Sequence, residues 1–364
     1  MSELEDKWNE VIRRAETTDA LFCIFKTRGG KTQFFASKGS QLSNYTPNTD
    51  GFILSSFDEN ELKMIHNDIS FNLDSEVDVA HFDEYIKLRK KLNPTSEKDS
   101  STSEKAYEQS FDIVIQKLQT KEATKIVLSA KQNIETKKSA FDIFSNIASK
   151  DSYEFAYLLH LPTGETWIGC TPEILLKKRS ESYSTISLAG TISNDGKQQW
   201  HEKEIREQQV VTDYITKRLN EVDANISVGT TYSKAAGMIQ HLCTDISFTS
   251  SESLSSLIKL LHPTPAVLGY PTSTALSAIK TAESHERELY SGVVGFQSSS
   301  KGEADIFVNL RCGKLHQNSI TLFAGGGIMP DSTEENEWNE VQMKFKSIRK
   351  SFFELKTANA NQTR

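Results

Sequence analysis

Phe323-Ala324-Gly325-Gly326-Gly327-Ile328 is a glycine run that follows a predicted strand and precedes a predicted helix at 335–353. Because glycine lacks a Cβ atom, the backbone of such a run can approach a ligand or another segment closely. The helix carries Glu337, Glu340 and Lys344, whose spacing places the three side chains on one face. This arrangement predicts a polar site that could hold a metal and an anion, although the same face could be an exposed row of salt bridges.

Outward from this stretch, the apolar pattern predicts helices and strands in irregular order. Because the two kinds of element do not alternate regularly, a doubly wound parallel sheet is disfavoured. The sequence therefore predicts an α+β fold with large antiparallel β-sheets. Helices are predicted at residues 107–118, 140–148, 202–219, 253–261 and 335–353. Strands are predicted at residues 20–25, 51–54, 125–128, 153–159, 174–176, 291–296, 305–310 and 320–324.

The composition excludes several classes of protein. The 364 residues are 37% hydrophobic, which suits one large domain or two closely joined ones. A formal net charge of −7 gives no general attraction for nucleic acid, so an anionic substrate would need a local basic pocket. We find no membrane-length apolar run, no signal-peptide pattern at the start and no Cys-x-x-Cys pair. We therefore expect a cytoplasmic protein without a nucleic-acid or membrane partner, and a monomer as the simplest state, which the sequence does not decide.

Four further segments carry candidate polar groups. Glu173 follows a proline and opens an apolar strand, so its carboxylate could face a cleft at a sheet edge. Glu207 lies early in the predicted helix at 202–219, where an acidic side chain could equally serve only the helix dipole. Leu261-His262-Pro263-Thr264-Pro265-Ala266-Val267 predicts a rigid loop, and Ser187-Leu188-Ala189-Gly190-Thr191 could offer backbone N–H groups to a carboxylate. Each of these two segments could also be an ordinary structural turn.

Taken together and in order, these segments resemble the chorismate-utilising enzymes, a family that includes isochorismate, salicylate, anthranilate and aminodeoxychorismate synthases. The resemblance extends over residues 104–350. Each segment alone is a weak signal, whereas the whole series in fixed order is specific. The matching segments are KIVLSA at 125–130, TPEILL at 171–176, LAGT at 188–191, KEIREQQVV at 203–211, QHL at 240–242, LHPTPAV at 261–267, RELYSGVVG at 287–295, VNLRCGKL at 308–315, FAGGGI at 323–328 and EWNEVQMK at 337–344.

The resemblance implies large antiparallel β-sheets packed in layers with helices outside, around a deep cleft that binds chorismate. It implies that residues 104–356 form the catalytic chorismate-binding region. Residues 1–95 would be a variable N-terminal part of the same fold. The polar segment 91–105 predicts a surface loop between the two parts.

The resemblance also implies a Mg²⁺ cofactor and a set of site residues. Glu207 and Glu340 correspond to the metal-binding glutamates, and the metal would hold the ring carboxylate of chorismate. Arg311 corresponds to the arginine that binds the enolpyruvyl carboxylate, with Tyr290 assisting. The other implied substrate contacts are Lys344 and backbone amides near Gly190 and Gly325 for the carboxylates, and Thr191 and His241 near the ring.

The branches of the family differ in what attacks ring carbon 2. In isochorismate formation, water attacks there and the 4-hydroxyl leaves, which requires a base and an acid. Lys125 corresponds to the family's water-activating lysine, and Glu173 to its general acid. Anthranilate synthases typically have glutamine at the Lys125 position, and aminodeoxychorismate synthases commonly have a nucleophilic lysine at the Ala189 position. The resemblance therefore implies a Mg²⁺-dependent isochorismate synthase of menaquinone or catechol siderophore biosynthesis.

Two alternatives stay open. A salicylate synthase would share the base and the acid and would also eliminate pyruvate, although its counterpart of the 261–267 loop usually reads differently. A catalytically silent homologue could act as a binding partner, but the retention of Lys125, Glu173, Glu207 and Glu340 argues against it.

Three positions depart from the family pattern. Ala130 stands where an arginine often follows the strand, and Gln208 stands where a histidine commonly follows the metal-binding glutamate. Leu268 takes a position that is usually small. These changes would alter the surroundings of the site without removing a group that contacts metal or substrate.

Overall fold

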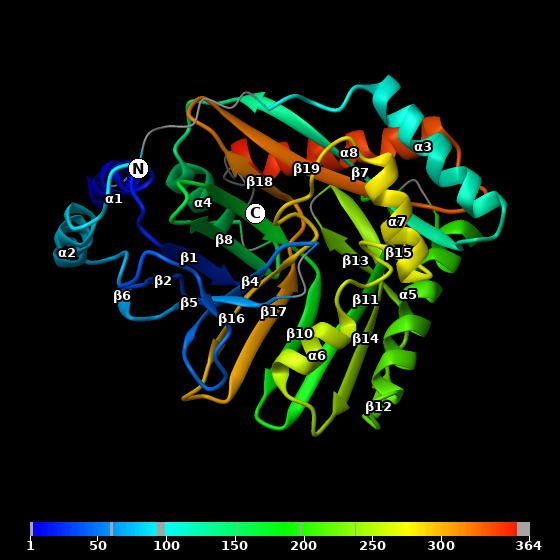
Figure 1. The fold of residues 1–364 in the computed structure, drawn as a ribbon, viewed down its shortest axis with the longest axis horizontal. Helices are drawn as coiled ribbons and strands as arrows, with labels where there is room; N and C mark the ends of the chain where they lie inside the picture. Colours follow the sequence, from blue (N-terminus) through cyan, green and yellow to red (C-terminus); the bar gives the residue numbers. More distant parts are fainter. Residues whose placement is uncertain are drawn as a thin grey trace, which may run out of the picture.

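The computed structural model describes residues 3–58, 61–92, 99–150, 152–196, 199–236 and 238–354. Two large antiparallel sheets face each other, and helices cover their outer faces (Figure 1). The sheets pack through a buried aromatic cluster, in which the rings of Phe155 and Phe307 stack 4.5 Å apart. This is the layered α+β fold that the sequence predicts, and it places the core between the sheets and beneath the helices.

The first sheet has nine strands among the described residues, and the longest pair lies near one edge. Its central strands alternate between the inter-sheet core and the core beneath the helices, which is why their residues are buried throughout. In spatial order the strands are β15 (Gly269–Tyr270), β7 (Lys125–Glu135), β19 (Ser319–Ile328), β18 (Cys312–Leu315), β9 (Thr166–Thr171), β8 (Phe155–His160), β1 (Phe22–Thr27), β2 (Gln33–Ala36) and β6 (Ile69–Phe71).

The second sheet has ten strands among the described residues. Along the main path they are β12 (Asn225–Val228), β14 (Ile239–Thr249), β11 (Ser182–Ser193), β10 (Ile174–Arg179), β17 (Glu303–Val308), β16 (Val293–Ser298), β4 (Gly51–Ser55), β5 (Lys63–His66) and β3 (Ser43–Asn44), while β13 (Tyr232–Ala236) also pairs with β14. The segment before residue 72 therefore contributes strands to the outer part of both sheets.

Helices cover the outer face of each sheet. The first sheet packs against α1 (Glu3–Ala15), α2 (Glu76–Lys87), α3 (Glu104–Gln119), α4 (Ala140–Ala148), α7 (Thr272–Ala282) and α8 (Glu334–Phe353). The second sheet packs against α5 (Glu202–Asn220) and α6 (Leu254–Leu261). None of the helices described is long and apolar enough to cross a lipid bilayer.

The predicted elements are confirmed in type, and some of their boundaries need correction. The glycine run was expected after its strand, but Gly325, Gly326 and Gly327 lie inside β19 and pair with β7. Backbone hydrogen bonding to β7 holds them in the strand despite the low β propensity of glycine.

The predicted surface loop at 91–105 also ends earlier than expected. Ser103 caps α3 with its side chain, so the helix begins at Glu104. Residues 93–98 of that loop, and residues 355–356 of the predicted catalytic region, lie outside the described residues.

Candidate active site

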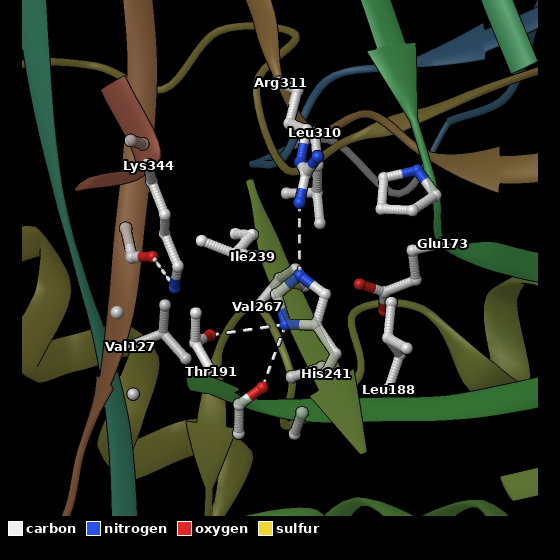
Figure 2. A pocket seen from close by; sticks show the side chains of 18 of the residues that line it. Val127, Glu173, Leu188, Thr191, Ile239, His241, Val267, Leu310, Arg311 and Lys344 are labelled. Carbon is white, nitrogen blue, oxygen red and sulfur yellow. Dashed lines mark hydrogen bonds between the residues drawn. The ribbon is translucent and has the colours of Figure 1, made fainter. Parts of the chain in front are cut away.

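A pocket lies where β7 and β19 of the first sheet meet β11 and β14 of the second (Figure 2). Helices α5 and α8 and the loop that includes Ala266 and Val267 complete its walls. It contains about 680 Å³ of space, part of which opens to solvent.

The structure brings all of the predicted site residues together at this pocket. Those that line it are Glu173, Gly190, Thr191, Glu207, His241, Tyr290, Arg311, Gly325 and Lys344. Lys125 and Glu340 lie directly behind this lining, because Lys125 pairs with Glu207 and Glu340 pairs with Lys344. The contacts of each residue therefore decide what the pocket can do.

Carboxylates from two helices converge on the glycines of β19. A Cβ atom added at Gly327 would lie 2.2 Å from Glu207 Oε1, and one at Gly326 would lie 3.4 Å from Glu340 Oε1 and 3.5 Å from Glu337 Oε2. Any side chain at Gly327 would therefore displace Glu207. The glycine strand provides the space into which these acidic side chains reach.

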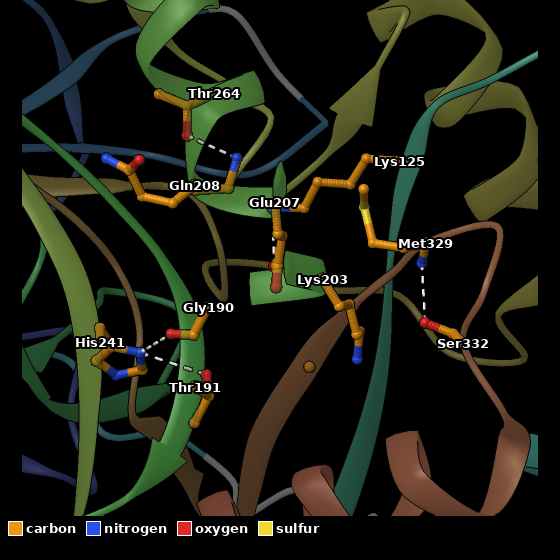
Figure 3. A network of polar contacts seen from close by, with 12 residues as sticks. Lys125, Gly190, Thr191, Lys203, Glu207, Gln208, His241, Thr264, Met329 and Ser332 are labelled. Atoms are coloured by element: carbon orange, nitrogen blue, oxygen red, sulfur yellow. Dashed lines mark hydrogen bonds and ion pairs between the residues drawn. The ribbon is translucent and has the colours of Figure 1, made fainter. Parts of the chain in front are cut away.

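Each of these carboxylates is paired with a lysine. Lys125 Nζ lies 3.0 Å from Glu207 Oε1, and Lys344 Nζ donates to Glu340 Oε1 at 2.7 Å. Lys203 binds Glu337, which is completely buried. Figure 3 shows Lys203, Glu207 and Lys125 side by side. Each carboxylate of this group therefore has a positively charged partner within the protein.

Sequence reasoning had placed Glu337 on the polar face with Glu340 and Lys344 without giving it a role of its own, and had not singled out Lys203. Both stand at helical spacings from predicted ligands, since Lys203 precedes Glu207 by four residues and Glu337 precedes Glu340 by three. That spacing was the available signal. The burial of Glu337 could not be read from it, because acidic residues in a first helical turn are usually exposed.

The surroundings of Glu173 favour its protonated form. Its carboxyl group points into the pocket from the residue before β10 (Figure 2). Burial raises its pKa to about 8, although the positive charges of Lys125, Lys234 and Lys344 oppose the shift. At neutral pH this group is therefore a carboxylic acid that can donate a proton.

Arg311 is held by groups that leave it facing the pocket. Its Nη1 donates to the carbonyl of Ala236 at 2.9 Å, and its Nη2 lies 3.2 Å from His241 Nε2. His241 Nδ1 lies 2.9 Å from the carbonyl of Gly190, so Nδ1 carries the hydrogen and Nε2 accepts from Arg311. Burial is the main cause that lowers the pKa of His241 to about 3, and the positive charge of Arg311 is the next. The imidazole is therefore neutral.

The backbone at Gly190 and Gly325 is shaped for close contacts. Gly190 has φ +71° at a register shift between β11 and β14, and a Cβ there would lie 3.0 Å from Glu204 Cβ. The carbonyl of Gly325 accepts from Lys344 at 2.7 Å. Tyr290 packs beside Gly325, with its ring stacked on Phe323 at 5.5 Å. Both glycines thus bring backbone to the pocket surface.

The three departures from the family pattern lie outside the pocket surface. Ala130 and Leu268 are buried in the core beneath the helices of the first sheet. Gln208 Nε2 lies within hydrogen-bond distance of the hydroxyls of Ser187 and Thr244, behind β11. These residues therefore affect packing and support around the site.

A two-sheet α+β fold with a pocket of carboxylates, lysines and a fixed arginine defines an enzyme class that binds a small anion. The sequence profile described as Chorismate binding enzyme matches residues 56–352. The chain belongs to this family.

Curated relatives include isochorismate synthases. Isochorismate synthase EntC of Escherichia coli is 31% identical over 245 residues, which cover 63% of this chain and 62% of EntC. Isochorismate synthase MenF of Escherichia coli is 33% identical over 195 residues, which cover 50% of this chain and 44% of MenF. The matched region is thus less than two thirds of either relative.

Solved structures share the fold over nearly the whole chain. The menaquinone-specific isochorismate synthase MenF from Escherichia coli gives a TM-score of 0.76 at 20% identity, covering 97% of this chain and 91% of that one. Anthranilate synthase component I from Streptococcus pneumoniae gives 0.65 at 18% identity, covering 90% and 89%. At these identities the likeness establishes the fold alone.

The raised pKa of Glu173 predicts a pH-dependent stability. A carboxyl group that ionises near 4.5 when unfolded and near 8 when folded stabilises the protein at low pH, and this contribution is lost as pH rises towards 8. Glu173→Gln removes that loss. We expect the free energy of unfolding of the variant, relative to the parent, to rise by at least about 1 kcal/mol between pH 5 and pH 8.5.

Urea unfolding at a series of pH values measures this difference. The matched control is Glu181→Gln, at an exposed turn, for which the parent and variant curves should run parallel. Parallel curves for Glu173→Gln would show that Glu173 ionises normally in the folded protein.

Proposed function

We propose that this chain is an isochorismate synthase, an isomerase that converts chorismate to isochorismate. Water adds at ring carbon 2 and the 4-hydroxyl departs. The observation that carries the proposal is the presence, at one pocket, of a buried lysine and a buried carboxylic acid that keeps its proton at neutral pH, Lys125 and Glu173. The names of the curated relatives give separate support.

Lys125 is the proposed base for the attacking water. Its side chain is fully buried, and its only ion pair among the described residues is with Glu207. A lysine can accept a proton only in its neutral form.

Glu173 is the proposed acid for the departing hydroxyl. Its proton is transferred to the 4-hydroxyl oxygen, which leaves as water. The water that attacks ring carbon 2 gives one proton to Lys125, and Glu173 supplies one to the leaving group. The conversion is therefore balanced in protons, as an isomerisation requires.

Local cations would bind the two carboxylates of chorismate, which the net charge of −7 would otherwise repel. Arg311 is the proposed partner of the enolpyruvyl carboxylate, because its planar fork is fixed by His241 and can donate in parallel. The remaining proposed contacts are Tyr290, which would assist Arg311; Lys344 and the amides near Gly190 and Gly325 for the carboxylates; and Thr191 and His241 near the ring.

Mg²⁺ is the proposed cofactor, with Glu207 and Glu340 as its ligands. Their hard oxygen donors suit this ion, and Glu337 Oε2, buried without a hydrogen-bond partner among the described residues, offers another. Within the described ranges no ready-made group of three or more metal-ligating side chains is present, and Mg²⁺ tolerates such an open set because it keeps several waters. When bound, Mg²⁺ would offset the charge of the ring carboxylate.

The proposal extends to the pathway and the location. The product would serve menaquinone biosynthesis or catechol siderophore biosynthesis, since the matched structures include a menaquinone-specific isochorismate synthase and a putative 2,3-dihydroxybenzoate-specific one. A cytoplasmic location is supported by four buried free cysteines, which suit a reducing compartment.

Product analysis tests the proposed function. Purified protein incubated with chorismate and Mg²⁺ should accumulate isochorismate, identified by chromatography. Salicylate with an equal amount of pyruvate would instead identify a salicylate synthase. If chorismate bound but stayed intact, the chain would be a silent homologue.

The metal ligands generate a second prediction. EDTA should abolish turnover, and Glu340→Gln should raise the Mg²⁺ concentration for half-maximal rate by at least about 10-fold, because a neutral amide binds a hard cation more weakly. Glu335→Gln, on an exposed face of the same helix, is the matched control and should leave the requirement unchanged. An unchanged requirement in Glu340→Gln would remove this residue from the metal site.

The base generates a third prediction. Lys125→Gln should bind chorismate nearly as the parent does but lose about 10²–10⁴-fold in kcat, because glutamine cannot take the proton from water. Lys131→Gln, on the same strand but outside the pocket, controls for damage to β7. Isochorismate formation by Lys125→Gln within a few-fold of the parent would exclude the lysine as the base.

A further inference from the structure

The strand that carries Lys125 is paired unequally on its two edges. On one edge β7 pairs with β19 over residues 126–135. On the other edge, the only strand it pairs with among the described residues is the short β15 (Figure 1). Tyr270 of β15 lies opposite Lys125, and the segment 101–102 binds β7 further along, at Lys131 and Asn133. Because alternate residues direct their N–H and C=O groups to the same edge, the backbone groups of Val127 and Ser129 need other partners there.

Two charged side chains supply two of those partners. Arg287 Nη2 donates to the carbonyl of Val127 at 2.8 Å, and Glu283 Oε1 accepts the N–H of Ser129 at 2.7 Å. The N–H of Val127 donates to the carbonyl of Leu268 at 3.0 Å. An ion pair therefore replaces part of the ladder of β7 where a neighbouring strand would otherwise run. We call Arg287 and Glu283 the edge pair.

The edge pair is buried and its members are joined by two hydrogen bonds. Arg287 is 2% exposed, and it donates from Nε to Glu283 Oε2 at 2.9 Å and from Nη2 to Oε1 at 2.6 Å. The guanidinium also lies 4.5 Å from the ring centre of Phe57. A buried pair with these contacts holds a defined geometry, because breaking it would leave an uncompensated charge in the core.

The edge pair connects two walls of the pocket. Arg287 Nη1 donates to the carbonyl of Val267 at 2.8 Å, so the same guanidinium binds β7 and the proline-containing loop. Val127 and Val267 both line the pocket. Lys125 lies two residues from Val127 and projects from the same face of β7. Neither member of the edge pair lines the pocket itself.

We propose that Arg287 and Glu283 are positioning residues for the reaction, which fix the strand bearing Lys125 against the loop bearing Val267. This inference rests on the proposed function, in which Lys125 is the base. The base must meet a water molecule placed over ring carbon 2, and a displacement of about 1 Å can lower a rate about 10²-fold. The edge pair acts on the step that Lys125 performs and leaves the carboxylate contacts of Arg311 in place.

Arg287→Lys tests the proposal. It keeps the positive charge, but a single ammonium group cannot bind both oxygens of Glu283 and both carbonyls. We expect kcat to fall about 10–100-fold while the Kd for chorismate, measured by titration, stays within about twofold of the parent. A parallel loss of kcat and chorismate affinity, or no loss in kcat, would overturn the proposal.

The matched control is Arg179→Lys. Arg179 also binds both oxygens of an aspartate, Asp305, but this pair joins β10 to β17 away from the pocket. The control should keep the parent kcat. If Arg179→Lys lowered kcat as much as Arg287→Lys, the effect would be general loss of stability, and the positioning role would be rejected.

Chemical rescue distinguishes the effect of the planar guanidinium group from the effect of its positive charge. In Arg287→Ala, guanidinium ion below denaturing concentration should restore part of kcat, whereas methylammonium, which has the same charge, should not. Equal rescue by the two ions, or none by guanidinium in a variant that remains folded by circular dichroism, counts against the proposal.

Amide hydrogen exchange provides a readout that does not depend on turnover. Glu283→Gln and Arg287→Lys should speed exchange at Ser129 relative to amides on the far side of β7, because the hydrogen bond to Glu283 is weakened. Unchanged exchange at Ser129 would overturn the proposal even if activity fell. If the parent protein failed to convert chorismate, the proposed function would fall, and exchange at Ser129 would then decide whether the edge pair orders β7.

Discussion

The pairing of β7 with β19 is the constraint on which the rest of the site depends. The paired stretch of β19 contains three successive glycines, so both faces of the strand lack side chains there. Glu207 from α5 and Glu340 from α8 reach into that space from different helices. A methyl group at Gly327 would lie 2.2 Å from Glu207 Oε1 and 2.7 Å from Lys125 Cε. Because glycine has no side chain, acidic and basic groups can lie close together at this strand.

Much of the fold could be predicted because its longer elements carry strong patterns. The expected helix at 140–148 matches α4, whose apolar residues recur at helical spacing. In contrast, α7 was not predicted, because its sequence TSTALSAIKTA has few large apolar residues and lacks a side-chain cap. The glycine end of β19 was also missed, since its strand conformation depends on partners distant in sequence.

The site was predicted from the family resemblance rather than from local pattern. Nothing in the sequence around Glu207 separates a pocket residue from a helix-dipole partner, and only its approach to Gly327 and Lys125 shows that it lies at the pocket. Lys203 and Arg287 were not singled out, because charged residues are usually exposed. Their burial results from packing between distant segments, which a single sequence does not reveal.

The edge pair has a consequence for how this protein behaves among other chains. An outer strand normally offers a row of free N–H and C=O groups, to which a strand of another molecule can add. Here the carbonyl of Val127 and the N–H of Ser129 are already bound by side chains. These positions of β7 are therefore closed to the strand-by-strand addition that begins aggregation, and this protection needs neither a covering strand nor a surface charge.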